Sequence, residues 1–166
     1  MEFTEIVNRI KEKFGDSLVP PGEDTIPHTI EVVPDRWGEV ARFLRDDDDL
    51  QFDSMMCITG VDWGEEEENL GVIYNLHSMT HRHKLEVRIT LPKSNAVVPS
   101  VEQIWRIADW FEREVYDMYG ITFDGHRDLR RILLPDDWEG YPLRKDYVFP
   151  ETWHGIAVPK LKEGWE

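Results

Sequence analysis

Cysteine is almost absent from the 166-residue sequence, and its single copy, Cys57, sets two limits. One thiol cannot close an intramolecular disulfide, and it cannot supply the cysteine cluster that a zinc or iron–sulfur centre requires. Because Cys57 lies in the apolar run Met55–Val61, the sequence predicts a small buried side chain there rather than a reactive thiol.

Long apolar runs are also missing, and no stretch approaches the roughly 20 residues that cross a bilayer. The N-terminal residues alternate charged and apolar side chains, unlike the continuous apolar stretch of a signal peptide. Basic residues are too few for a nucleic-acid binder, since 19 Lys and Arg stand against 34 Asp and Glu and leave a net charge of −15. We therefore expect a cytoplasmic protein without membrane insertion, which contacts a membrane only through partners.

Motifs that cradle a nucleotide phosphate or present a catalytic serine are missing as well. His77, His81 and His83 suggest a metal site, but the spacing crosses an expected turn and no Cys or acidic ligand is interleaved. We expect a surface hairpin here, and no catalytic residue, cofactor ligand or metal ligand in the chain. A small stand-alone metal-binding enzyme that uses the His77–His83 cluster is the alternative from another class of protein.

What the sequence does contain is a succession of periodic segments. Apolar residues recur at helical spacing over residues 3–14, which Gly15 ends, and from the Pro34-Asp35 cap to about Arg45. Runs typical of strands occupy residues 28–33, 54–62, 70–78 and 84–91. These segments predict an α+β fold with a small, mostly antiparallel sheet of about four strands packed by helices.

The best-marked helix is expected over Val101–Tyr119, with Ser100 and Gln103 as a capping box and Gly120 as the stop. Successive residues are 100° apart, so one apolar arc contains Ile104, Trp105, Ala108, Phe111, Val115, Met118 and Tyr119. Arg113 and Asp117 point away from that arc. Glu112 lies near its centre, where a carboxylate needs a partner. The expected partners, in order of preference, are Arg130, Arg131 and His126.

After about Pro135 the periodicity stops, although tryptophans and prolines continue to the end of the chain. A long structureless stretch is uncommon in a compact domain, and aromatic side chains without a local core usually contact a partner. The sequence therefore predicts a compact α+β domain over residues 1–135. It also predicts that residues 136–166 form an extended C-terminal arm that docks on partner subunits.

Two dense charged motifs flank the start of this arm. Residues 112–133 fit the pattern E-R-E-x-x-D, two apolar residues, six of any kind, His, three of any kind, Arg, one more and two aliphatics. Residues 142–147 are P-L-R-K-D-Y. In both motifs the chain resembles the C-subunit family of respiratory complex I, the counterpart of the mitochondrial iron–sulfur-fraction subunit. Tyr141 and Tyr147 depart from the His and Phe of many members, but both retain an aromatic ring.

The resemblance implies a cofactor-free structural subunit in the hydrophilic arm of a proton-translocating NADH–quinone oxidoreductase. FMN, iron–sulfur clusters and quinone would belong to partner subunits, chiefly the quinone-site D-subunit and the neighbouring iron–sulfur B- and I-subunits. The implied location is peripheral, on the cytoplasmic side of the cell membrane. The implied signature and interface residues are Glu112, Arg113, Glu114, Asp117, His126, Arg130, Arg131, Pro142, Leu143, Arg144, Lys145, Asp146 and Tyr147.

The same two motifs also suit related machines. A membrane-bound hydrogenase and a ferredoxin- or F420H2-linked quinone reductase contain an equivalent subunit with a similar pattern. The sequence leaves this alternative open, because the motifs describe the subunit and not its neighbours.

Overall fold

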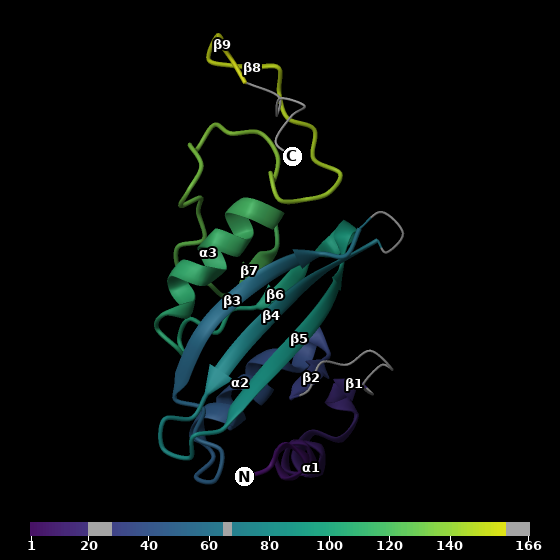
Figure 1. Cartoon of the computed structure of the whole chain (residues 1–166), viewed down its shortest axis with the longest axis vertical. Coiled ribbons are helices and arrows are strands. Elements are labelled where there is room, and N and C mark those ends of the chain that lie inside the picture. Colours follow the sequence, from purple (N-terminus) through teal and green to yellow (C-terminus); the bar gives the residue numbers. More distant parts are fainter. Residues whose placement is uncertain (20–27, 65–67, 159–166) are drawn as a thin grey trace, which may run out of the picture.

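A five-stranded sheet forms the centre of the computed structural model, which describes residues 1–19, 28–64 and 68–158 (Figure 1). The strand order is β1-β2-β5-β4-β3. Its strands are β1 Leu18–Val19, β2 Thr29–Val32, β3 Ser54–Asp62, β4 Asn69–His77 and β5 Lys84–Pro92. The α-helices are α1 Phe3–Phe14, α2 Trp37–Asp46 and α3 Ala108–Tyr119. Short 3-10 turns cover Gly15–Ser17, Pro34–Arg36 and Lys93–Asn95.

The sheet is mixed, because three of its strand pairs are antiparallel and one is parallel. Strands β3, β4 and β5 form an antiparallel meander of long strands, while β2 runs parallel to β5 with Ile30 opposite Val87. The parallel pair arises because the chain passes through α2 and two further strands between β2 and β5. The predicted α+β fold with a small, mostly antiparallel sheet is confirmed.

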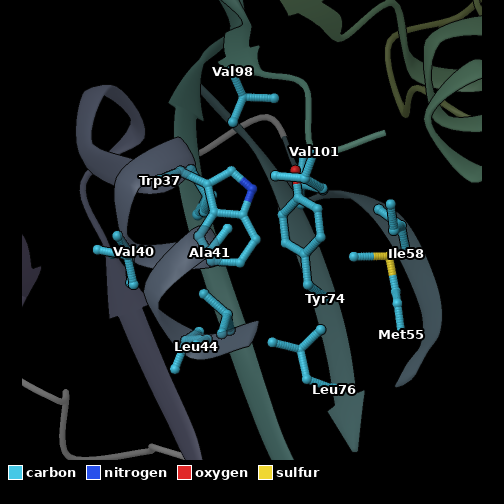
Figure 2. Packing of buried hydrophobic residues seen from close by; sticks show 14 of the residues in the cluster. Trp37, Val40, Ala41, Leu44, Met55, Ile58, Tyr74, Leu76, Val98 and Val101 are labelled. Carbon is cyan, nitrogen blue, oxygen red and sulfur yellow. The ribbon is translucent and has the colours of Figure 1, made fainter. Parts of the chain in front are cut away.

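The core lies between one face of this sheet and the helices. Alternate residues of β5 are buried from Leu85 to Leu91, as their apolar–polar alternation predicts. Figure 2 shows Trp37 of α2 against Tyr74 of β4, and their ring centroids are 4.5 Å apart. The predicted apolar face of α2 is also buried, and each large side chain there stabilises the fold by about 1.5–3 kcal/mol.

Cys57 departs from its predicted place in the core. A β-bulge shifts the register between Met55 and Cys57, so that Met55 and Ile58 face the core and the two residues between them do not. Cys57 is half-buried, and Asn75 Nδ2 lies 3.5 Å from its Sγ. The prediction of a buried thiol was therefore wrong, because apolar composition does not reveal a bulge.

Helix α3 is shorter than predicted. It begins at Ala108 rather than at Val101, and the intervening residues form turns. Ser100 does not cap the helix, because its Oγ donates a hydrogen bond of 2.6 Å to the Glu112 carboxylate. The expected stop at Gly120 is confirmed, since this residue adopts a left-handed conformation with φ 70°.

Close approach holds α3 along β3 at one edge of the sheet (Figure 1). A Cβ atom at Gly60 would lie 2.4 Å from the Tyr119 ring, so only glycine admits this contact. Beyond the helix, β7 (Thr122–Asp124) pairs in parallel with β6 (Val97–Pro99). None of the helices in the described ranges is both long enough and apolar enough to cross a bilayer.

The chain after β7 forms no further α-helix within residues 125–158. Its last described element is a small antiparallel hairpin of β8 (Thr152–Trp153) and β9 (Ile156–Ala157), at the opposite end of the molecule from α1 (Figure 1). Before that hairpin, residues 140–147 return to the compact part of the chain. The predicted arm also includes residues 159–166, which lie outside the described residues.

Candidate functional site

The charged motif residues gather around α3 and the two segments that follow it. The first segment, residues 126–134, runs along the helix from Asp109 to Asp117, and the second, residues 140–147, crosses its C-terminal end. The described contacts form three groups, which surround Asp117, Asp62 and Glu112.

Asp117 is the anchor of the first segment. Its Oδ2 accepts backbone hydrogen bonds from Ile132, Leu133 and Leu134 at 3.0, 2.7 and 2.9 Å, and its Oδ1 accepts one from Arg131 at 2.7 Å. Burial alone would raise the pKa of this carboxyl, but the four donors hold the pKa of Asp117 below its ordinary value. The prediction that Asp117 points away from the apolar arc is correct in direction. It does not reach solvent, because the following segment covers it.

Arg131 joins the two segments. One guanidinium nitrogen binds Asp117, and the other donates to the Gly140 carbonyl at 3.0 Å. The centre of the Tyr141 ring lies within cation–π distance of two guanidinium carbons, 5.4 Å from that of Arg131 and 4.8 Å from that of Arg144. These contacts fasten the second segment to the first.

Residues 140–147 are also fixed directly on the end of α3. Arg144 Nε donates to the Tyr119 carbonyl at 2.6 Å, which satisfies one of the free acceptors at a helix C-terminus. The Tyr141 ring lies against Gly120, where a Cβ atom would come within 2.4 Å of it. Gly120 therefore both ends the helix and admits the returning chain.

Asp62, at the end of β3, anchors residues 140–147 to the sheet, and no motif in the sequence indicates it. Its carboxylate accepts hydrogen bonds from the backbone N–H groups of Gly64 and Lys145 at 3.0 Å each, and Lys93 Nζ also lies 3.0 Å away. These donors outweigh desolvation and keep the pKa of Asp62 below its ordinary value. Its main contact lies 83 residues further along the chain, and no local signal in the sequence indicates it.

Glu112 is fully buried, as predicted, but its partners differ from those predicted. Its oxygens accept hydrogen bonds from Ser100 Oγ at 2.6 Å and from Val101 N at 2.7 Å. His126 Nε2 is the nearest basic atom, at 3.9 Å. With little compensation for its burial, the pKa of Glu112 rises to about 7.

The favoured pairing of Glu112 with an arginine was wrong. Arg131 binds Asp117, and Arg130 Nε forms a surface ion pair with Asp128 at 3.0 Å. Both arginines lie in the later part of residues 126–134, which contacts α3 at Arg113 and Asp117, C-terminal to Glu112. Only the third choice, His126, lies close to the Glu112 carboxylate.

The side chain of His126 is enclosed between its own loop and α3. Its Nδ1 accepts the backbone N–H of Asp128 at 3.1 Å, which leaves Nε2 to carry the proton. Nε2 donates to the Asp109 carbonyl at 3.2 Å. His126 therefore positions the loop against the helix.

Arg113 is buried rather than solvent-exposed, because residues 130 and 131 of the first segment lie over it. Its guanidinium donates to the carbonyls of Arg130 and Arg131 at 3.3 and 3.4 Å. Tyr147 acts similarly further along, with its hydroxyl donating to the Glu139 carbonyl at 3.1 Å.

The other predicted site residues point outwards or lie at the surface. Glu114, Leu143, Lys145 and Asp146 are exposed, and Pro142 is half-buried. The backbone of this stretch is fixed, since Leu143 N donates to the Met118 carbonyl at 3.1 Å. The motif thus combines buried anchors with exposed side chains, although Lys145 Nζ lies 3.5 Å from the Trp63 carbonyl.

The histidine cluster lies far along the chain from these contacts and has partners of its own. His83 is buried and its Nε2 lies 2.7 Å from the Leu50 carbonyl, while His81 Nε2 lies 3.0 Å from the Asp48 carbonyl. Among the residues that the structure describes, no group of three or more His, Cys, Asp or Glu side chains is arranged to hold a metal ion.

Comparisons with known proteins agree with this arrangement. The family described as "Respiratory-chain NADH dehydrogenase, 30 Kd subunit" matches residues 30–152, which include β3, β4, β5, α3 and the segments 126–134 and 140–147. In this chain the matched region therefore contains most of the α+β domain and the two segments fastened to α3. The chain belongs to this family.

Individual relatives carry a more particular name. The NADH-quinone oxidoreductase C-subunit of Chloroherpeton thalassium is 52% identical over 153 residues, covering 90% of this chain and 62% of the relative. The protein of the same name from Chlorobium phaeobacteroides is 45% identical over 152 residues, covering 90% of this chain and 91% of the relative.

Two solved structures share the fold. A chain of an archaeal respiratory membrane complex, the membrane-bound sulfane sulfur reductase, superposes with a TM-score of 0.71 at 28% identity, covering 87% of this chain and 85% of that one. A trypsin-resistant fragment of Nqo5 has a TM-score of 0.59 at 26% identity, covering 78% of this chain and all of the fragment.

Proposed function

We propose that this chain is a structural subunit of the hydrophilic arm of an NADH–quinone oxidoreductase, with no catalytic residue of its own. Family membership and the two relatives that carry the name of the C-subunit support this assignment. The whole complex would transfer electrons from NADH to a quinone and translocate protons. The chain would supply binding surface to that machine.

The main support for the proposal is that Asp117 holds residues 131–134 against α3, directly before the predicted arm. Four hydrogen bonds to one buried carboxylate hold residues 131–134 against α3, and Arg131 extends the contact to Gly140. Such buried, fully bonded groups give a segment one defined path. We infer that the path directs the arm, residues 136–166, towards partner subunits.

The arm presents apolar side chains that its own domain does not cover. Val148, Phe149 and Ile156 are exposed in a chain whose core is otherwise well buried. Large apolar side chains of this kind are typical of protein–protein contacts. The partners we propose are the quinone-site D-subunit and the iron–sulfur B- and I-subunits, on the cytoplasmic side of the membrane.

FMN, iron–sulfur clusters and quinone are proposed to reside in the partners. The support is chemical, since a lone half-buried Cys57 cannot ligate a cluster. For the alternative of a small metalloenzyme, purified protein should be analysed for metal. About one zinc per chain, lost in His83→Ala, would favour that alternative.

A second candidate has specific support. The likeness to a chain of the membrane-bound sulfane sulfur reductase favours an equivalent subunit in a related respiratory complex, such as a membrane-bound hydrogenase or a ferredoxin- or F420H2-linked quinone reductase. Purification of the tagged chain from membranes, followed by mass spectrometry, separates the candidates. Co-purification with a flavin- and NADH-binding subunit and NADH–quinone activity supports the first. A complex without that subunit supports the second, and recovery of the chain alone contradicts both.

A further inference from the structure

The outer side of α3, near its start, carries an apolar pair that neither the core nor the fastened segment uses. Trp110 is 62% exposed, and Ile107 lies beside it at the i, i+3 spacing of one helix face. Ile107 directly precedes α3 and already has helical torsion angles, φ −68° and ψ −23°. Exposed tryptophans on a rigid surface are enriched at protein–protein interfaces, so this pair is a candidate contact.

Arginines surround this pair. The Arg113 guanidinium carbon lies 5.6 Å from the centre of the Trp110 ring. Arg106 and Arg127 both contact the Asp109 carboxylate, at 3.6 and 2.7 Å. Arg113 is itself buried, so we call only Arg106, Ile107, Trp110 and Arg127 the Trp110 surface.

The charges of this surface are layered. Arg106 and Arg127 also bind Glu102, at 3.4 and 3.1 Å, and the Glu102 side chain is only 2% exposed, whereas that of Arg106 is 70% exposed. The carboxylates therefore lie beneath and the guanidinium groups face the solvent. In a chain with a net charge of −15, this layering gives an outward-facing set of cationic donors.

A pocket lies beside these donors. Its volume is about 440 Å³, and it is lined by Arg45, Glu102, Gln103, Ile104, Arg106 and Arg127. The one carboxylate in the lining is already bonded to two of the three arginines. A guanidinium group offers paired donors that match a carboxylate, so the pocket suits an incoming Asp or Glu side chain.

We propose that the Trp110 surface docks on a carboxylate-bearing surface of a neighbouring subunit, with Trp110 in an apolar recess and acidic side chains in the arginine-lined pocket. The proposal rests on the proposed function only in taking that neighbour from the same complex. Tryptophan and arginine are the residues enriched among interface anchors. An acidic partner matches the outward guanidinium groups, while the rest of this acidic chain would repel it.

Competitive incorporation tests the proposal in the assembled complex. Cells express the wild-type chain together with a variant distinguishable by mass, and the ratio of the two in the complex purified from membranes is measured. Trp110→Ala should be about 30-fold under-represented, as expected for loss of an interface anchor. Arg106→Glu should be under-represented more strongly than Arg106→Gln, because it repels the acidic partner. Met79→Ala is the matched control, since Met79 is 64% exposed on the β4–β5 hairpin, and it should compete equally.

A second measurement excludes misfolding as the cause. Hydroxyl-radical footprinting of the wild-type chain should show Trp110 protected in the complex and reactive in the free chain, with Met79 as the reference. If Trp110 reacts equally in both states, or if Trp110→Ala competes equally, the docking proposal is wrong while the proposed function stands. If the wild-type chain enters no complex, the proposed function fails. Protection of Trp110 by a second copy, detected as a dimer of the free chain, also overturns the proposal.

Discussion

Glu112 and Asp117 are both fully buried on the same helix, yet their carboxylates lie in opposite chemical environments. Asp117 accepts three backbone N–H groups and the guanidinium of Arg131, and its pKa is lowered. Glu112 is desolvated, accepts one N–H and one hydroxyl, lies near the carboxylates of Glu102 and Asp109, and its pKa is raised to about 7. The difference shows that donors, rather than burial, decide whether a buried acid stays ionised.

The two environments also imply different roles. Asp117 holds the backbone of residues 132–134, at the end of the first segment after α3. Glu112 holds Ser100 and Val101, which precede the helix. One carboxylate therefore fixes the chain that leaves α3, and the other fixes the chain that enters it.

The largest effect is expected from Asp117→Ala. The substitution leaves the guanidinium of Arg131 and three backbone N–H groups without their acceptor, and should lower the free energy of unfolding by about 3–5 kcal/mol. Urea unfolding of the purified wild-type chain and variant measures this difference in the free energy of unfolding. The matched control is Glu114→Ala on the exposed side of the same helix, which should change the stability by less than about 0.5 kcal/mol. Equal effects of the two variants would show that Asp117 is not an anchor.

Glu112→Ala should have the next largest effect. It leaves the Val101 N–H without an acceptor and opens a small cavity, so a loss of about 2–4 kcal/mol is expected, again far above that of Glu114→Ala. Glu112→Gln keeps an acceptor for Val101 N and a donor for Ser100 Oγ, and should retain most of the stability. A loss in the glutamine variant as large as in the alanine variant would contradict this account.

The pH dependence of stability sharpens the comparison. The folded pKa of Glu112, about 7, exceeds its ordinary value of 4.5, so the folded state holds this proton more tightly than the unfolded state. Protonated Glu112 therefore contributes fully to the free energy of unfolding below about pH 4.5, its ordinary pKa. This contribution is lost as the pH rises through its folded pKa of about 7, which lowers the free energy of unfolding by about 3 kcal/mol. The pH dependence from Asp117 has the opposite sign, because its folded pKa is lowered. Its contribution to the free energy of unfolding is present above the ordinary pKa of the carboxyl and is lost as the pH falls below that value.

The effect is measured by urea unfolding of the wild-type chain and of Glu112→Gln between about pH 5 and about pH 8, because histidine titration is common to both chains and largely cancels in their difference. The difference in stability between the wild-type chain and Glu112→Gln should grow in favour of the glutamine variant as the pH rises. A constant difference across this range would mean that Glu112 does not titrate there.

The smallest effect on stability is expected from removing residues 148–166. Val148, Phe149 and Ile156 are exposed, so their deletion costs the domain little buried area, and the melting temperature should stay nearly unchanged. Incorporation into the complex should nevertheless fall, because these side chains are proposed to contact partners. Deletion of residues 140–166 is the comparison, and it should destabilise the domain because it also removes the Arg144 and Lys145 contacts. A large loss of melting temperature in the shorter deletion would place the arm against its own domain.

The helices and strands that could be predicted are those specified by apolar spacing and stop residues within a few positions of each other. The first helix was predicted over residues 3–14 and is observed there, because apolar spacing and Gly15 specify it locally. The alternation in residues 84–91 likewise predicted β5 and its buried face. The charged motifs indicated the family, which the comparisons confirm.

The start of α3 is where local signals failed. Ser100 and Gln103 have the spacing of a capping box, yet the helix begins at Ala108. The hydroxyl of Ser100 and the N–H of Val101 bind Glu112 instead, so a tertiary contact took the groups that a cap would use. The bulge that turns Cys57 away from the core is a similar case, because it depends on the pairing of two strands.

The sequence by itself determined α1, the strands β3, β4 and β5, the burial of Glu112 and the family, because periodicity and motif spacing are properties of neighbouring residues. Only the tertiary structure decided which charges meet. Arg131 reaches Asp117 rather than Glu112, and Asp62 receives the N–H of Lys145 from 83 residues away. The physical reason is that a hydrogen bond requires donor and acceptor within about 3 Å, a condition set by the path of the whole chain and not by the separation of two residues along it.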